Sequence, residues 1–226
     1  GIEAALRIKE QLGGTVTVVS MGPPQADVAL REALAMGCDE AYLVSAREFG
    51  GSDTYATSGI IAAALKKIGY DLIITGRQAI DGDTAQVGPQ IAEKLHLPQV
   101  SYVEEVVEAA ADHVVVKRQF EDGYHIIKIK TPCLLTAIAE LATPRYMSVR
   151  GIVEAYEKEI KVLGFEDLKD GLELDMIGLK GSPTNVYQSF TKEVKGAGTI
   201  LEGLSADEAV TVSYTHLRAH ETGAYL

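Results

Sequence analysis

The chain has 226 residues, two cysteines and a formal net charge of −11 at pH 7, and 46% of its residues are hydrophobic. The excess of acidic residues argues against nucleic-acid binding, which needs a basic surface. No apolar run is long enough to span a membrane, so we expect no membrane insertion. The two cysteines have no disulfide or metal-binding spacing, which favours a reducing, cytoplasmic setting.

The first 95 residues alternate between helical and strand patterns. Apolar periodicity predicts helices over 2–12, 25–36, 57–68 and 84–95, and β-branched runs predict strands over 15–20, 41–44 and 72–75. Short connections between such elements favour a parallel sheet that is covered by helices on both faces. Because the chain opens within a helix, where an α/β domain would ordinarily have a strand first, we expect that a natural N-terminal strand is missing.

After Pro98 the pattern changes to a series of strands, predicted over 100–107, 113–120, 124–130 and 133–138. The Asp122-Gly123 dipeptide predicts a hairpin, and hence an antiparallel extension of the same sheet. Beyond Pro144 the periodicity weakens, with one helical stretch at 152–160 and no clear helix or strand over 164–182. We therefore divide the chain into an α/β domain over 1–150 and an arm over 151–211 that packs on another chain.

The loop from Gly76 to Pro89 reads GRQAIDGDTAQVGP and joins a predicted strand to a predicted helix. Free amides in the first turn of a helix, together with the helix dipole, form an anion site. Such a loop also lies at the carboxyl end of its strand, where ligands of open α/β sheets bind. The loop predicts a phosphate-bearing ligand held by the amides of Thr84 and Gln86, with Arg77 as the nearby cation. A plain strand-to-helix connection is the alternative.

Asp83 and Gln86 have the spacing of a capping box, which predicts that Asp83 is the N-cap of the helix that follows. Asp53 or Ser52 is the predicted N-cap of the preceding helix. The Ser20-Met21-Gly22-Pro23 turn follows a strand and is either a second wall of the nucleotide site or a simple strand-ending turn. There is no pattern for a catalytic acid, base or nucleophile.

The Gly76–Pro89 sequence resembles the signature of the beta subunit of electron-transferring flavoproteins. Further matching stretches are Val19–Pro24, Ala33–Ala41, Pro144–Ile152 and Gly181–Thr184. The resemblance implies a three-layer, adenine-nucleotide-hydrolase-like α/β domain and a C-terminal arm that wraps an alpha subunit. The cofactor-binding residues that it implies are Met21, Gly76, Arg77, Gln78, Ala79, Ile80, Asp81, Gly82, Asp83, Thr84, Ala85, Gln86 and Val87.

Two functions fit this resemblance. In ordinary members the beta subunit holds AMP structurally, and the only flavin sits in the alpha subunit. In bifurcating members the same pocket holds the adenosine part of a second FAD, which takes a hydride pair from NADH and splits the electrons between two acceptors. The DGDTAQVGP and VSMGPP sequences resemble the bifurcating group, so we expect FAD. The chain would then be an electron-carrier subunit that is redox-active only with its alpha subunit and flavin.

An alternative from another class is a homodimeric ATP-binding stress-type sensor protein with the same α/β layout. Such proteins usually carry a glycine-rich loop late in the domain, which this sequence lacks, and they have no use for an arm.

The stretch after Pro144 combines apolar residues with arginines, which suits either a protein interface or a loop that covers the core. The resemblance implies that it is the recognition loop for a partner such as an acyl-CoA dehydrogenase, with Val149 at its tip. The predicted partner-recognition residues are Arg145, Tyr146, Met147, Ser148, Val149 and Arg150. Residues 212–226 do not fit the family and are interpreted as a non-native tail. We therefore give no functional weight to the i,i+4 pair His216 and His220, and we expect no metal site.

Overall fold

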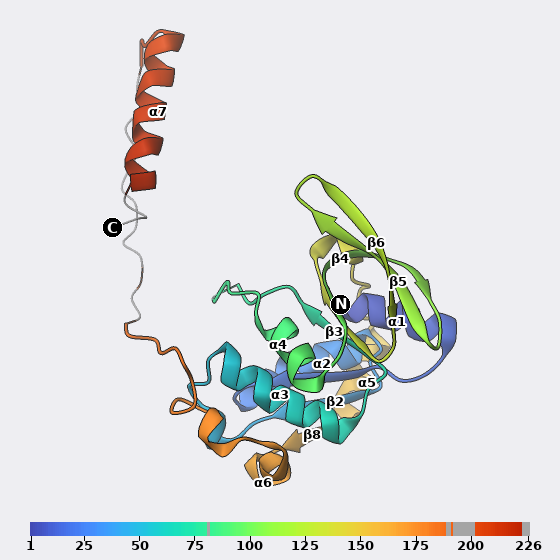
Figure 1. The fold of residues 1–226 in the computed structure, drawn as a ribbon. Helices are drawn as coiled ribbons and strands as arrows, with labels where there is room; N and C mark the ends of the chain where they lie inside the picture. The colour runs from blue at the N-terminus through green and yellow to red at the C-terminus, as the bar shows by residue number, and fades with distance from the viewer. Residues whose placement is uncertain (81, 189–190, 192–201, 223–226) are drawn as a thin grey trace. The chain divides into compact units, whose positions relative to one another are not determined.

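A computed structural model describes residues 1–80, 82–188, 191 and 202–222, with the backbone alone for 216–222. The chain divides into two compact units, Gly1–Asn185 and Val186–Leu226 (Figure 1). The first unit has two sheets with helices packed against them. In the second unit, the described helix is α7 (Ala206–Thr222).

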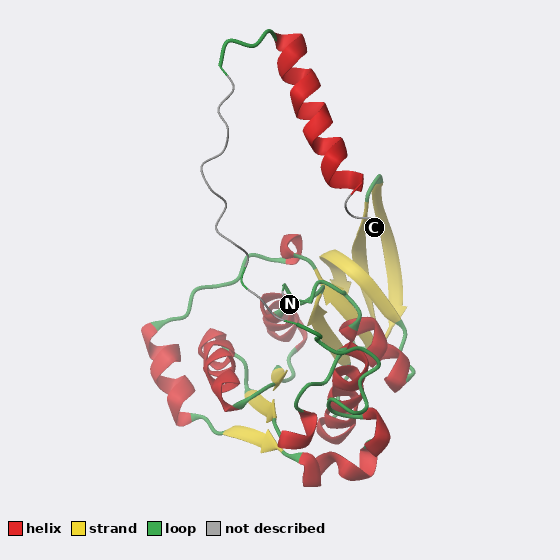
Figure 2. Ribbon diagram, turned by 90° about the vertical axis from the view of Figure 1, so that its left-hand side faces the viewer, coloured by secondary structure: helices red, strands yellow, loops and turns green. Residues whose placement is uncertain are grey.

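The smaller sheet is parallel and contains strands β1, β2 and β8 in that order (Figure 2). Their bounds are Thr17–Met21, Glu40–Val44 and Ile160–Leu163. Met21 lies opposite Val44 in the register, so β1 and β2 end at the same edge of this sheet. The crossover from β1 to β2 contains a short 3-10 turn (Pro24–Ala26) and helix α2 (Asp27–Met36).

The larger sheet has the order β3-β7-β4-β5-β6. Its strands are Leu72–Gly76, Cys133–Ala137, Gln99–Ala109, His113–Phe120 and Gly123–Lys130. β3, β7 and β4 are parallel, whereas β4, β5 and β6 are antiparallel, which confirms the predicted extension and its hairpin at Asp122-Gly123. The structure differs from one continuous sheet, because among the described strands β1 pairs with β2 alone and β3 with β7 alone.

Helices cover both faces of the strands, as the sequence predicts for an α/β fold. On one side lie α1, α2 and α5, and on the other lie α3 and α4, with α1, α3, α4 and α5 spanning Ile2–Leu12, Thr54–Ile68, Val87–Leu95 and Val149–Glu157. Strand β7 shows the consequence of two buried faces. Its Leu134 packs with α3 and α4, while the next residue, Leu135, packs in the opposite cluster with β4 and β5.

Residues 151–185 belong to the first unit, so the boundary that the sequence placed at residue 150 differs from the division in the structure. Ala155 of α5 is buried against α2, and Arg31 of α2 donates hydrogen bonds to the carbonyls of Ala155 and Lys158 at 2.6 and 2.5 Å. Strand β8 pairs with β2, and α6 (Phe165–Leu168) packs on α3. These elements are short, which explains why the sequence periodicity is weak there.

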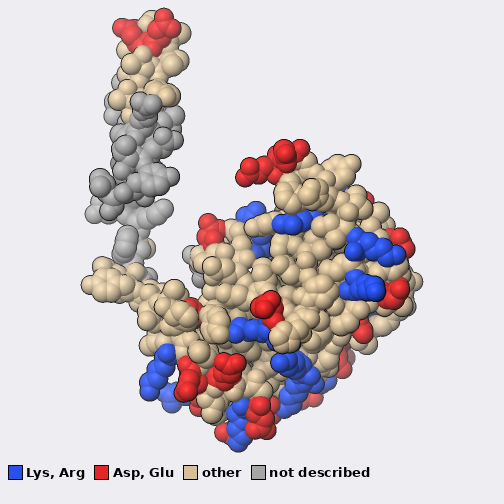
Figure 3. Space-filling view, in the orientation of Figure 1, with Lys and Arg blue, Asp and Glu red and all other residues tan. Residues whose placement is uncertain are grey.

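Helix α7 runs across residue 212, where the sequence analysis placed the start of a non-native tail; that interpretation stays a prediction. Among the residues that the structure describes, no helix has the length and apolar character to cross a membrane. Acidic and basic side chains are interspersed over much of the face of the first unit that Figure 3 shows.

Candidate functional site

The loop between β3 and α4 is largely exposed and extends outward from the carboxyl end of β3 (Figure 1). Helix α4 begins at Val87, three residues later than predicted, and the predicted capping box is wrong. The reason lies in the backbone, because Asp83 and Ala85 have φ values of +50° and +53° and therefore interrupt the right-handed helix. The Asp83 amide instead donates to the Ala79 carbonyl at 3.0 Å, and its carboxylate accepts a hydrogen bond from Gln78.

The first turn of α4 presents free amide donors, and the predicted role of the Thr84 and Gln86 amides just before it stays a prediction. Gln86 occupies the N-cap position but makes no side-chain capping bond. The amides of Val87 and Gly88 have no acceptor in the part of the chain that the structure describes, and Pro89 has no N–H to satisfy. A Cβ on Gly88 would lie 2.6 Å from Thr75 Oγ1, so a glycine is required for α4 to start this close to β3.

The surroundings of the loop fit a phosphate-bearing nucleotide. A Cβ built on Gly76 or Gly82 would meet no atom within 4 Å, so there is open space beside the backbone. Thr75 Oγ1 and Gln90 Oε1 are buried without a hydrogen-bond partner among the described residues. Free amides at a helix start beside an open-sided loop suit the phosphate group of a nucleotide, whereas these two oxygens are enclosed by the protein.

Of the other predicted cofactor residues, Ile80 is fully exposed and Arg77 is exposed. Asp81 lies outside the described residues. Met21 is half-buried at the end of β1 and packs against the core cluster that contains Phe49 and Ile60, so part of its side chain contributes to the hydrophobic core.

The residue that reaches the loop from the neighbouring helix is Thr54, which the sequence analysis did not single out. Thr54 is the first residue of α3, and its hydroxyl donates to Gln86 Oε1 at 2.9 Å. Asp53 is the N-cap of α3, as predicted, and accepts from the amides of Tyr55 and Ala56 at 3.0 Å. The available sequence signal was the Gly50-Gly51 turn before α3, which parallels the glycine-containing loop before α4.

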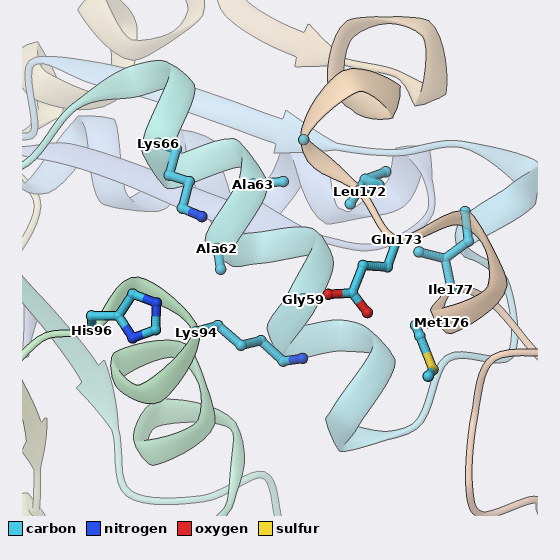
Figure 4. Close-up of a pocket in the computed structure, with 11 residues that line it drawn as sticks. Gly59, Ala62, Ala63, Lys66, Lys94, His96, Leu172, Glu173, Met176 and Ile177 are labelled. Atoms are coloured by element: carbon cyan, nitrogen blue, oxygen red, sulfur yellow. The ribbon is translucent and has the colours of Figure 1, made fainter.

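A separate cavity of about 330 Å³ lies between α3, the far end of α4 and residues 171–177 (Figure 4). Lys94 and Glu173 extend toward Gly59 of α3, and Lys94 Nζ lies 3.8 Å from the centre of the Tyr55 ring. The lining includes none of the predicted cofactor residues. The cavity therefore lies apart from the predicted nucleotide loop.

The second predicted site, at residues 145–150, gives an exposed apolar surface. Val149 is 81% exposed, and Ser148 caps α5 by accepting a hydrogen bond from the Gly151 amide at 2.9 Å. Arg150 is exposed and pairs with Glu154. We define the α5 patch as the exposed side chains Tyr146, Met147, Val149, Ile152, Val153 and Tyr156.

Arg145 lies elsewhere, against α1, and anchors the segment that carries the α5 patch. Its backbone amide and its Nε both donate to Glu3 Oε2, at 3.1 and 2.8 Å, and its Nη1 donates to Glu10 Oε1 at 2.7 Å. Glu3 is only 5% exposed. The Arg145 hydrogen bonds lower the pKa of Glu3 to about 2 against the opposing effect of burial, with a further contribution from Arg7.

This fold and this loop belong to a known family. Residues 1–168 match the electron transfer flavoprotein domain, so the chain belongs to the electron transfer flavoprotein family, and the family implies flavin-related electron transfer. The predicted resemblance to beta subunits is confirmed by the relatives. The match gives no support to the alternative of a homodimeric ATP-binding sensor.

Three relatives are similar to this chain over most of its length. The chain is 57% identical over 203 residues to electron transfer flavoprotein subunit beta of Thermoanaerobacterium thermosaccharolyticum, covering 89% of this chain and 77% of the relative. It is 55% identical over 213 residues to acryloyl-CoA reductase electron transfer subunit gamma of Anaerotignum propionicum, covering 92% and 79%. It is 53% identical over 209 residues to caffeyl-CoA reductase-Etf complex subunit CarD of Acetobacterium woodii, also covering 92% and 79%.

Proposed function

We propose that this chain is the beta subunit of a heterodimeric, electron-bifurcating flavoprotein, and that the loop from Gly76 to Val87 binds the adenosine diphosphate part of an FAD. The observation that carries the proposal is the start of α4, where amides without an acceptor among the described residues follow a loop that has open space beside Gly76 and Gly82. The names of two relatives, which refer to acryloyl-CoA reductase and caffeyl-CoA reductase complexes, favour a role with acyl-CoA-type redox partners.

The chain's own residues would bind and orient the cofactor. The amides of Val87 and Gly88 suit the pyrophosphate, and the left-handed conformations at Asp83 and Ala85 give the loop its shape. When bound, a flavin supplies two-electron and one-electron chemistry, while the protein supplies position and electrostatics. AMP would use the same phosphate-binding features, so AMP is the competing ligand for this site.

The α5 patch is the proposed docking surface for the redox partner. It combines two tyrosines, a methionine and three aliphatic side chains, which is the composition of interface centres. The Arg145–Glu3 pair holds the start of this segment on α1. The two proposed protein partners are an alpha subunit and an acyl-CoA-type dehydrogenase. The proposed location is the cytoplasm.

The nucleotide site can be tested with Ala85→Val in the chain co-expressed with its alpha subunit. Ala85 already carries the penalty of a Cβ in the left-handed conformation, and the branched side chain of valine adds further crowding there, so we expect FAD to bind this site several-fold more weakly. Thr84→Ala should weaken binding only modestly. Ala29→Val is the matched control, because Ala29 is exposed in the regular helix α2. Unchanged FAD content in Ala85→Val, or an equal loss in the control, would refute the assignment.

A further inference from the structure

Residues 178–184 are fastened to the loop that precedes α3. The Gly178 amide donates to Ser52 Oγ at 3.1 Å, and the Leu179 amide donates to the Gly50 carbonyl at 3.1 Å. The approach is close, because a Cβ on Gly178 would lie 2.3 Å from the Glu48 carbonyl oxygen. This segment is therefore a built part of the first unit.

Ser182 and Thr184 both bind Asp53. Ser182 is buried, and its hydroxyl accepts a hydrogen bond from the Asp53 amide at 2.8 Å and donates to the Gly178 carbonyl at 2.7 Å. The amide and the hydroxyl of Thr184 donate to Asp53 Oδ2 at 3.0 and 2.9 Å. Burial acts to raise the pKa of Asp53, but the hydrogen bonds from Ala56, Thr184 and Tyr55 outweigh it and keep the carboxylate charged.

The two carboxylate oxygens of Asp53 therefore have different tasks. Oδ1 caps α3, and Oδ2 holds Thr184. The next residue, Thr54, donates its hydroxyl to Gln86 at the end of the nucleotide loop. Thr184, Asp53, Thr54 and Gln86 thus form one continuous line of contacts from residues 182–184 to the start of α4.

We propose that Asp53 and Thr54 are positioning residues for the nucleotide loop, and that Ser182 and Thr184 hold them in place. The inference rests on the proposed nucleotide site. Thr184 is the residue before Asn185, where the first unit ends, so its contact with Asp53 fixes the chain at the point where it leaves that unit. Because coupling between two sites is reciprocal, nucleotide in the loop strengthens the attachment of residues 182–184, and that attachment strengthens nucleotide binding.

The test uses the heterodimer stripped of nucleotide, with AMP as the probe and calorimetry as the assay. Thr54→Val and Thr184→Val each remove one hydroxyl from the line of contacts. We expect each to raise the dissociation constant for AMP about threefold to tenfold. In the double variant, the loss should be smaller than the sum of the two single losses, because both changes act on the same line, in which the Thr184 amide still donates to Asp53 Oδ2.

Two controls separate positioning from general destabilisation. Thr184→Ser keeps the hydroxyl and should bind AMP like the wild type, and Thr143→Val changes an exposed threonine outside this line. Hydrogen exchange gives the reciprocal measurement: AMP should slow exchange of the Thr184 amide in the wild type but not in Thr54→Val. A merely structural role would not produce this difference.

The possible results are distinct. If the wild type binds AMP while the two threonine variants bind it equally well, or their losses simply add, the positioning inference is wrong and the nucleotide site stands. If AMP protects the Thr184 amide equally in Thr54→Val, the line of contacts does not carry the coupling. If the wild type binds neither AMP nor FAD, the proposed function fails and the inference fails with it.

Discussion

Replacing Arg145 with glutamine tests whether this residue is an anchor within the chain. Arg145 donates two side-chain hydrogen bonds to Glu3, whose side chain is buried, and the pKa of Glu3 is lowered from 4.5 to about 2. This lowering corresponds to about 3.4 kcal/mol at about 1.36 kcal/mol per pH unit. The Arg145 side chain is 33% exposed, so water screens part of the interaction, and Arg7 remains as a second partner. We therefore expect Arg145→Gln to lower the free energy of unfolding by about 2 kcal/mol at pH 7.

The pH dependence gives this prediction its sharpest form. Because the pKa of Glu3 is lower in the folded protein, its contribution is complete above pH 4.5 and disappears as the pH falls toward 2. Urea unfolding at pH 7 and at pH 3 should show a smaller difference between wild type and Arg145→Gln at the lower pH. Arg150→Gln is the control, since Arg150 is exposed and should leave stability unchanged. A loss that is absent at pH 7, or equal at both pH values, would refute the reasoning.

Three further changes have defined outcomes. Gly88→Ala should lower the free energy of unfolding, measured with urea, by about 1–3 kcal/mol, because the added Cβ would lie 2.6 Å from Thr75 Oγ1 and 2.9 Å from Thr136 Cγ2. Gly76→Ala is the control and should have little effect, since its Cβ would meet no atom within 4 Å. Val149→Asp on the α5 patch should reduce electron transfer to a partner dehydrogenase about tenfold or more at unchanged flavin content. The same substitution at exposed Val28 of α2 should leave electron transfer unchanged. Loss of flavin from Val149→Asp would mean that the patch is structural. Burial raises the pKa of Cys133 to about 11 and also raises that of Cys38. A thiol reagent at pH 8 should therefore react with neither cysteine in the folded protein and with both after denaturation.

The regular elements could be predicted from the sequence because their signals are local. The helix over Ile2–Leu12 and the strand over His113–Phe120 have the predicted bounds, and each shows one clear apolar period or a β-branched run. The start of α4 was misplaced because its interruption depends on left-handed Asp83 and Ala85. Sequence rules assign that conformation mainly to glycine.

The side-chain contacts that hold the two sites in place could not be predicted, because they join residues that are distant in sequence. Arg145 binds Glu3 across 142 positions, and Thr184 binds Asp53 across 131. No local pattern encodes such pairs, so the sequence does not reveal that Arg145 binds Glu3, and the partner-recognition role that the resemblance implies for Arg145 stays a prediction. The Gly76–Val87 loop itself was predictable, because a strand, a glycine-containing turn and a helix form a local and recognisable series.

The most direct test of the account is the nucleotide content of the purified heterodimer. The full-length chain would be co-expressed with its alpha subunit, the complex denatured, and the released FAD and AMP quantified per complex. We expect two FAD and no AMP, since the loop before α4 would hold the second flavin. One FAD and one AMP would contradict the bifurcating assignment and leave the loop as a structural nucleotide site, and one FAD without AMP would contradict nucleotide binding by this chain.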